Sequence, residues 1–181
     1  YDVLILSADF GTGHHQVSLA LRKVLEAENP FLKVGIINFF KFIPSLWDRA
    51  LKFGYFNMIK HFPRSYDWFY GVTRHVKPNS HWQKILNRVG QQKLLSFIEK
   101  TSPKIIVCTF PTPAGVISQL KAKGTIHIPL IAVITDVAAH SQWLHPQVDS
   151  YLIGADTLLP QMIRIGIPRH KIHVTGIPVR P

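Results

Sequence analysis

The stretch that decides the fold is Val3-Leu-Ile-Leu-Ser-Ala-Asp-Phe-Gly11-Thr-Gly13-His14-His15, an apolar run that breaks into a glycine turn. The next apolar positions repeat with the spacing of one helix face, at Val17, Ala20, Leu21, Val24 and Leu25. The pattern predicts a strand, a loop and a helix in immediate succession. Backbone N–H groups at such a helix start favour an anionic ligand, and glycine lets the backbone approach it closely.

The glycine turn has two interpretations. Gly11-Thr-Gly13 lacks the third glycine of the dinucleotide fingerprint and the lysine of a P-loop, so it fits neither motif. It can be a strand-to-helix turn that needs glycine only for its own geometry. His14 favours a ligand site, because a residue in the first helical turn faces the carboxyl edge of a parallel sheet.

Length and composition favour one α/β domain. The chain has 181 residues, of which 46% are hydrophobic, enough for a single substantial core. Its single cysteine, Cys108, lies inside the apolar run 104–109, which predicts a buried reduced thiol and fits a cytosolic setting. We find neither a signal-peptide pattern nor an apolar run of the roughly 18 to 20 residues that span a bilayer.

The net charge of +11 predicts an anionic partner, since only 10 acidic residues balance 21 Lys and Arg. Nucleic acid and an anionic membrane surface both meet this requirement, and charge alone does not separate them. Membrane-surface segments mix basic residues with large apolar and aromatic side chains, whereas nucleic-acid faces carry dense Lys/Arg clusters. The distribution of aromatic residues therefore becomes the deciding feature.

Strands and helices alternate along most of the chain. Further strands are predicted at 33–38, 104–109, 129–135, 150–153 and 172–175. Helices are predicted from about 80 to 100, from 111 to about 123, and from a cap at Asp156 to Gly166. Continuous apolar strands alternating with helices imply a parallel sheet covered by helices on both faces.

The segment from Phe39 to Tyr70 departs from this alternation. It holds 12 of the chain's 20 aromatic residues, interleaved with Lys and Arg. A strand-to-strand crossover needs far fewer residues than this region provides, so we expect a helical insertion. Core packing could account for some of the aromatics, yet no helical frame places all of them on one face. Exposed aromatics beside basic residues suit a lipid headgroup interface or a lipid-binding groove.

A second candidate constellation follows the strand at 129–135. It contains Asp136, His140, Trp143 and His145. Because ligands bind outside the carboxyl ends of parallel strands, we expect these residues at the same edge as His14 and the segment 109–112. A metal site and purely structural loop histidines are both alternatives for this pattern. Trp143 in a polar loop would offer a flat apolar platform to a sugar or an acyl chain.

The residues favour a transfer reaction. The sequence has no nucleophile elbow and no catalytic Cys/His pattern. What remains is an anion-binding helix start, a histidine that can act as a base, and a carboxylate that could orient a hydroxyl or that histidine. Such a site suits a hydroxyl acceptor that attacks an activated carbon with a phosphate leaving group.

Three separated segments in order resemble one enzyme family. These are Ser7-Ala-Asp-Phe-Gly-Thr-Gly-His14, the segment from Ile134 to His145, and Val174-Thr-Gly-Ile-Pro-Val-Arg-Pro181. Together they resemble the N-terminal domain of the diacylglycerol glycosyltransferases, the bacterial processive glucosyltransferases and plant monogalactosyldiacylglycerol synthases. Those enzymes are relatives of the peptidoglycan lipid-intermediate N-acetylglucosaminyl transferase. The likeness covers essentially the whole chain.

The resemblance implies a GT-B architecture, in which two Rossmann-like domains face each other across a cleft. Residues 1–176 would form the N-terminal acceptor-side domain, with a helical membrane- or lipid-associating insertion at 39–75. Residues 177–181 would start the interdomain linker, and the C-terminal donor domain would be absent. The chain alone is then expected to be inactive.

The resemblance also implies roles for individual residues. His14 would be the general base, and Asp136 would support it as the second catalytic residue. Gly11, Thr12 and Gly13 would approach the donor diphosphate or the acceptor hydroxyl, although Gly-Thr-Gly departs from the three glycines of some relatives. The substrate-binding residues would be Phe110, Thr112, His140, Trp143 and His145. The membrane or lipid contacts would come from Trp47, Phe53, Phe56, Lys60 and Trp68.

We therefore expect an inverting transfer of a hexose from a UDP-sugar to diacylglycerol. UDP-glucose is the first candidate donor and UDP-galactose the next, with no cofactor or metal required and no nucleic acid bound. The enzyme would lie at the cytoplasmic face of a bacterial membrane, on anionic phospholipid. The alternatives are N-acetylglucosamine transfer to a polyprenyl-linked acceptor, or a non-catalytic module that binds anionic lipid or nucleic acid.

Overall fold

The computed structural model describes residues 1–8, 12–43, 90–136, 138–139 and 141–178. Six strands form one parallel sheet in the order β2-β1-β3-β4-β5-β6. The strands are β1 (Val3–Ser7), β2 (Val34–Asn38), β3 (Ile105–Cys108), β4 (Leu130–Val133), β5 (Ser150–Ile153) and β6 (Ile172–Val174). All six predicted strands are confirmed, each within two residues of its predicted ends. The fold is the predicted Rossmann-like α/β class.

The strand order reverses direction at β1. The chain passes from β1 to β2 through α1 (Thr12–Glu28) on one side, and then returns to β3 on the other side of β1. Leu6 of β1 pairs with Ile37 of β2 and with Cys108 of β3, so the carboxyl ends of the three strands lie level. Ligands of open parallel sheets bind at this kind of reversal, where two loops leave in opposite directions.

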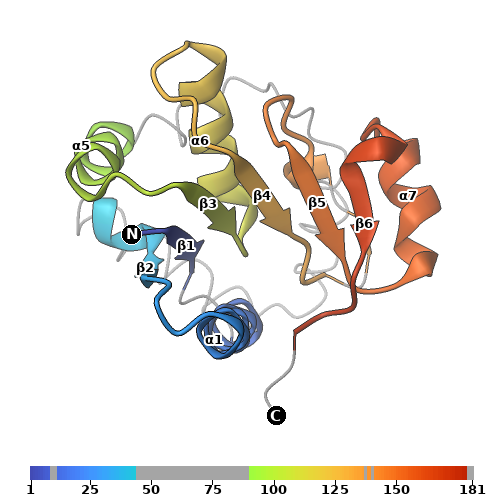
Figure 1. The fold of residues 1–181 in the computed structure, drawn as a ribbon. Helices are drawn as coiled ribbons and strands as arrows, with labels where there is room; N and C mark the ends of the chain where they lie inside the picture. The colour runs from blue at the N-terminus through green and yellow to red at the C-terminus, as the bar shows by residue number, and fades with distance from the viewer. Residues whose placement is uncertain (9–11, 44–89, 137, 140, 179–181) are drawn as a thin grey trace, which may run out of the picture.

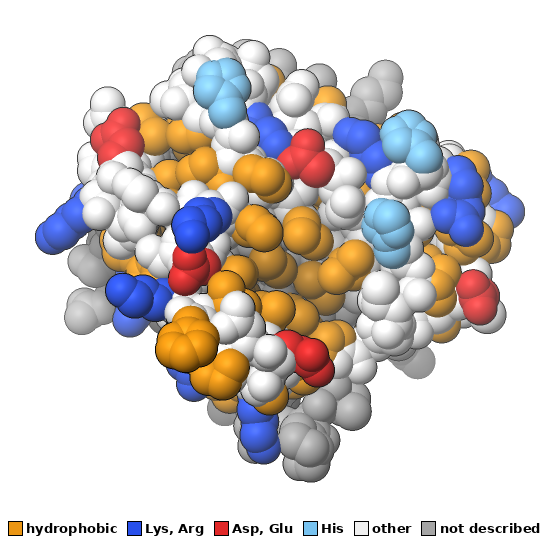
Figure 2. All heavy atoms as spheres, viewed as in Figure 1, with side chains coloured by type: hydrophobic (Ala, Val, Ile, Leu, Met, Phe, Trp, Pro, Cys, Tyr) orange, Lys and Arg blue, Asp and Glu red, His pale blue; other side chains and the backbone are white. Residues whose placement is uncertain are grey.

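The two faces of the sheet carry separate apolar cores. Residues of α5 (Gln91–Thr101), α6 (Pro111–Ala122) and α7 (Leu159–Arg164) belong to the larger cluster, whereas α1 packs on the opposite face (Figure 1). On the α1 face, Ile105, Ile131 and Leu152 are only partly buried. Figure 2 shows hydrophobic side chains gathered in a hollow near the middle of the view. The predicted helices on both faces are confirmed.

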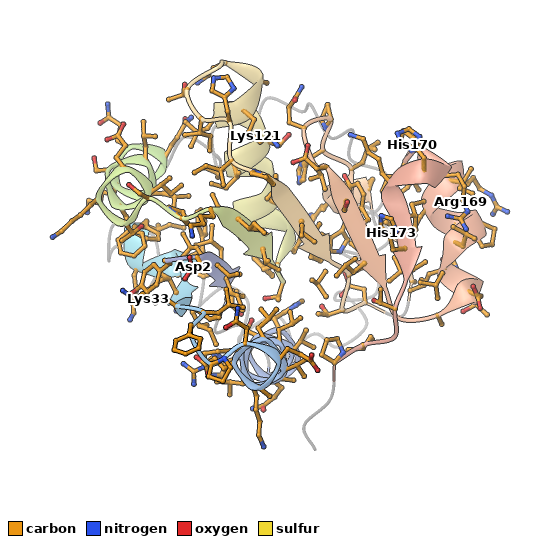
Figure 3. All side chains as sticks on the ribbon, viewed as in Figure 1. Asp2, Lys33, Lys121, Arg169, His170 and His173 are labelled. Atoms are coloured by element: carbon orange, nitrogen blue, oxygen red, sulfur yellow. The ribbon has the colours of Figure 1, made fainter. Side chains whose placement is uncertain are left out.

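Charged contacts tie the opposite, amino-terminal edge of the sheet together. Asp2 accepts a hydrogen bond from the Lys33 backbone N–H at 2.9 Å, and its other oxygen lies 2.8 Å from Lys104 Nζ. Figure 3 shows Asp2 beside Lys33. The hydrogen bond to Lys104 lowers the pKa of the Asp2 carboxyl. These contacts therefore join β1, β2 and β3 at the amino-terminal edge. The loops that follow the strands lie at the opposite, carboxyl edge.

The aromatic segment, predicted as an insertion over 39–75, begins inside the core. Phe39, Phe40 and Phe42 of the 3-10 helix η1 (Phe39–Phe42) are all buried. Phe42 contacts Phe97 of α5, with ring centroids 5.4 Å apart. The first three aromatics are thus core residues, because η1 lies against α5. The rest of the insertion lies outside the described residues, as do Trp47, Phe53, Phe56, Lys60 and Trp68.

Three details of the predicted helices are wrong or untested. Val24 is 53% exposed rather than packed, although Leu21 and Leu25 of the same helix pack against the core of that face. Asp156 does not cap a helix; it starts the 3-10 helix η3 (Asp156–Leu158), and α7 follows without a side-chain cap. The helix predicted over 80–100 is described only as α5, preceded by Gly90 at φ 81°.

The single cysteine matches a simpler prediction. Cys108 is a free thiol with no exposed surface, and burial raises its pKa. This confirms the buried position that its apolar neighbours predict. Within the described parts of the chain, we find no helix with the length and apolarity needed to cross a bilayer.

Candidate active site at the carboxyl edge of the sheet

His14 is the centre of the candidate site. It lies in the first turn of α1, directly after the loop that follows β1, and is half-buried. Its Nδ1 atom lies 2.8 Å from the backbone oxygen of Thr109 and 2.7 Å from the hydroxyl oxygen of Thr135. A carbonyl oxygen can only accept, so Nδ1 carries the hydrogen. In the neutral ring the lone pair is then on Nε2, and no described residue hydrogen-bonds to that atom.

The strand order brings these three residues together. Thr109 follows β3 and donates its backbone N–H to Leu6 O of β1 at 3.1 Å. Thr135 follows β4, which pairs with β3. The neighbouring strands β1, β3 and β4 run in parallel, so the residues after them meet at one edge. His14 and Thr135 are 121 residues apart in the sequence, yet they are in direct contact in the folded chain.

Two buried hydroxyls hold α1 against β3 below His14. Ser18 and Thr109 have no exposed surface, and their hydroxyl oxygens lie 3.0 Å apart. The Ser18 hydroxyl also donates to the His14 backbone oxygen at 2.9 Å. Since buried hydroxyls are costly to leave unpaired, this pair favours one placement of the helix on the sheet. The backbone that carries His14 is fixed by the same contacts.

Phe110 packs against the histidine ring. Their centroids lie 5.1 Å apart with the rings nearly perpendicular, and the Phe40 ring lies 6.0 Å from that of Phe110. Such an edge-to-face pair restricts the imidazole plane. Thr112 lies two residues further on, in the first turn of α6, and is half-buried. The structure thus places Phe110 in direct contact with His14.

Asp136 bonds to a residue other than His14. Its Oδ2 atom accepts a hydrogen bond from Trp143 Nε1 at 2.7 Å. Trp143, in the 3-10 helix η2 (Ser141–Trp143), has no exposed surface and belongs to the core cluster. The expected open indole platform is therefore wrong, because the ring packs into the core below the loop. The indole instead holds the Asp136 carboxylate in place.

His145 is also buried rather than open to a ligand. It is 6% exposed, and its Nε2 atom lies 3.3 Å from the Pro111 backbone oxygen. Burial lowers its pKa to about 4, against the opposing effect of hydrogen bonds to the backbone. The hydroxyl of Tyr151 accepts from the His145 backbone N–H at 3.2 Å and donates to nearby carbonyls. His145 is a core histidine in this structure, not a residue of a ligand surface.

The glycine loop is described only in part. Gly11 and His140 lie outside the described residues, and Thr12 begins α1. Gly13 is exposed, and a β-carbon built on it would meet no atom within 4 Å. Nothing in the described structure therefore requires glycine at position 13. The space beside it is free for a bound group.

A metal site draws no support from the described residues. No group of three or more His, Cys, Asp or Glu among them is placed to hold an ion. Asp136 and His145, the described members of the proposed ligand pattern, bond to Trp143 and to Pro111 instead. Both of these described side chains thus bond to the protein itself.

Sequence reasoning missed the residues that hold His14. Thr135 directly precedes Asp136. The sequence favours Asp136 as the partner of His14, because a carboxylate is the more common partner of a histidine. Ser18 follows His14 by one helical turn, a spacing at which a serine hydroxyl reaches the backbone oxygen. Ser7 differs from these residues: its buried hydroxyl, at the carboxyl end of β1, has no hydrogen-bond partner among the described residues.

Comparison with known proteins gives relatives along nearly the whole chain. Residues 14–179 match the model of the monogalactosyldiacylglycerol (MGDG) synthase family. A processive diacylglycerol beta-glucosyltransferase of Staphylococcus carnosus is 31% identical, over 98% of this chain and 44% of that protein. One from Bacillus pumilus is 30% identical, over 99% of this chain and 46% of that protein. The chain thus spans less than half the length of these relatives.

Two solved structures share the fold. The apo form of the lipopolysaccharide outer core galactosyltransferase WaaB superposes with a TM-score of 0.54 at 15% identity, over 95% of this chain and 44% of that one. MurG of Acinetobacter baumannii gives a TM-score of 0.54 at 12% identity, over all of this chain and 46% of that one. The two superpositions show a shared fold, the Rossmann-like parallel sheet. With the family model covering most of its residues, the chain belongs to the monogalactosyldiacylglycerol synthase family.

Proposed function

We propose that this chain forms the acceptor-side domain of an inverting glycosyltransferase that transfers a hexose from a UDP-sugar to the hydroxyl of diacylglycerol. Residues 1–176 form that domain, and residues 177–181 lead toward a donor-binding domain. The family match and the names of the relatives support the reaction class. The geometry of His14 is the observation that carries the mechanism.

His14 acts as the general base in this proposal. Its Nδ1–H is held by the Thr109 carbonyl at 2.8 Å, so the free lone pair is on Nε2. As the acceptor oxygen attacks the anomeric carbon, Nε2 takes the hydroxyl proton. The bond between that carbon and the phosphate oxygen breaks, UDP leaves, and the configuration at the carbon inverts. The Thr109 carbonyl and the Thr135 hydroxyl then stabilise the imidazolium.

The start of α1 suits the anionic part of the donor. Unpaired backbone N–H groups at a helix start favour phosphate, and the free space beside Gly13 leaves room for close approach. Thr12, Gly13 and the adjacent Gly11 are the residues we assign to this contact. Phe110 and Thr112 line the neighbouring loop after β3, with His140 in the loop after β4, and we assign these three to the acceptor.

Asp136 has a supporting role in this proposal. Its second carboxylate oxygen is not used by the Trp143 bond, and the residue is half-buried at the carboxyl edge next to Thr135. A carboxylate there can accept a hydrogen bond from a substrate hydroxyl. Trp143 and His145 act through the loop that they hold in place.

We place the enzyme on the cytoplasmic surface of a bacterial membrane, bound to anionic phospholipid. The net charge of +11 and the mixture of aromatic and basic residues after position 43 support such a surface. Residues Trp47, Phe53, Phe56, Lys60 and Trp68 are the contacts we assign to it. Sedimentation with vesicles that contain anionic lipid, across a salt series, is expected to show binding that weakens with salt. Tight binding to a random DNA duplex without vesicle binding would contradict this assignment.

The test of the reaction uses the full-length natural polypeptide. Purified protein is mixed with diacylglycerol vesicles and with UDP-glucose, UDP-galactose or UDP-N-acetylglucosamine in turn, and the lipid products are separated by chromatography. We expect glucosylated diacylglycerol, with galactose transferred more slowly. Transfer of N-acetylglucosamine to a polyprenyl-linked acceptor in place of diacylglycerol would overturn the proposal.

A further inference from the structure

Thr135 contacts His14, and neither its place in the sequence nor the family match gives Thr135 a role. Its hydroxyl oxygen lies 2.7 Å from Nδ1, and the Thr109 backbone oxygen lies 2.8 Å from the same atom. Two oxygens from neighbouring strand ends therefore meet one ring nitrogen. The Asp136 carboxylate, one residue further on, is bonded to Trp143 instead.

Only one proton arrangement satisfies both oxygens. If Nδ1 had no hydrogen, it could accept from the Thr135 hydroxyl, but its lone pair would face the Thr109 carbonyl at 2.8 Å. If Nδ1 carries the hydrogen, both oxygens accept it in a shared hydrogen bond. The second arrangement has no repulsive contact, so the geometry selects the ring with its lone pair on Nε2.

We propose that Thr135 is a positioning residue, whose hydroxyl oxygen joins the Thr109 carbonyl in accepting the Nδ1–H of His14. In many enzymes a carboxylate holds this hydrogen. Here two neutral acceptors on adjacent strands do so, and they fix both the tautomer and the plane of the ring. The inference rests on the proposed role of His14 as the base.

The test replaces the hydroxyl and keeps the shape. Thr135→Val is expected to lower kcat about 10-fold while the KM values for both substrates stay unchanged. The loss is partial because the Thr109 carbonyl remains. Thr135→Ser, which keeps the hydroxyl, is expected to recover most of the lost kcat. Thr125→Val is the matched control, since Thr125 is exposed on the connection between α6 and β4.

A spectroscopic readout separates positioning from a merely structural effect. Nitrogen-15 NMR of the histidine rings, in mildly alkaline buffer, reports which nitrogen carries the hydrogen. Wild-type His14 is expected to show a protonated Nδ1 and a bare Nε2, and Thr135→Val is expected to show a larger share of the opposite tautomer. Thermal unfolding of each variant checks that the fold is retained.

Several outcomes would overturn the inference. A wild-type kcat in Thr135→Val would do so, as would a Thr135→Ser variant as slow as the valine variant. An unchanged tautomer would also overturn it, even with a lower kcat. If His14→Ala turns over at the wild-type rate, the proposed base is wrong, whereas the NMR spectra still decide whether Thr135 sets the tautomer.

Discussion

His14, in the first turn of α1, and His145, in the loop after η2, both lie near the carboxyl edge of the sheet, yet their surroundings are opposite. His14 is half-buried, with Nδ1 held by two oxygens and no described partner on Nε2. His145 is almost fully buried, and burial lowers its pKa to about 4. The difference teaches that a position at the ligand-binding edge is not sufficient for a histidine to act as a base. One ring nitrogen must also be held in place, and the other must be available to a substrate.

The strongest test of the comparison is the loss of each candidate base. His14→Ala is expected to lower kcat between about 100-fold and 10,000-fold, because the acceptor hydroxyl loses its proton acceptor. Thermal unfolding should stay close to wild type. The control is His127→Ala, an exposed histidine on the connection between α6 and β4. Equal turnover in the two variants would remove His14 as the base.

The second test uses the pH dependence of stability, to which His145 contributes. The unfolded histidine binds its proton near pH 6.5 and the folded one only near pH 4, so the unfolded state holds more protons between these values. Stability is therefore lost as pH falls through this window, by up to about 3 kcal/mol from this group.

His145→Gln removes that titration and keeps a side-chain N–H for the Pro111 carbonyl. Urea unfolding at several pH values is expected to give a shallower loss for the variant than for wild type. Equal slopes for the two proteins would show that His145 is not buried as described, and the contrast with His14 would fail.

The third test asks whether a bound group approaches the backbone beside His14. Gly13→Ala meets no atom in the protein and raises helix propensity, so stability is expected to stay equal or to rise by up to about 1 kcal/mol. We expect kcat/KM for the UDP-sugar to fall about 10-fold, because the methyl group occupies the free space. Unchanged kinetics in a stable variant would show that no substrate comes close to this position.

The fourth and smallest effect concerns the loop around His145. Trp143→Phe keeps a buried ring but removes the 2.7 Å hydrogen bond to Asp136, so we expect a loss of about 1 kcal/mol in the free energy of unfolding. Water can reach the half-buried carboxylate and limits the loss. We expect kcat to change far less than in His14→Ala. A loss of turnover as large as that one would place the Asp136 loop in the catalytic machinery and break the comparison.

The fold was largely predictable because its information is local. Each strand is an apolar run, and the glycine turn marks the passage from β1 to α1. Burial of single side chains was less predictable, because it depends on distant elements. Trp143 has polar neighbours in sequence, but its ring reaches the core under α6, and Phe39 to Phe42 pack against α5.

The candidate site was predictable only at its centre. His14 and the strand-end loops follow from the order of strands in a parallel sheet. The partner of His14 does not, because a backbone oxygen leaves no trace in a sequence and a threonine at a strand end is common. The choice between Thr135 and Asp136, which are adjacent, depends on side-chain directions that only the folded chain sets.

The Thr109 contact has a consequence for how this site can change during evolution. The oxygen that accepts the Nδ1–H belongs to the main chain, and every amino acid supplies the same atom there. No single codon change at position 109 deletes it. Substitutions at Thr135 or Ser18 can weaken the support around the ring. The Thr109 carbonyl still favours the same tautomer, and only a change that moves the strand removes it. A histidine held in this way tolerates sequence drift in its neighbours.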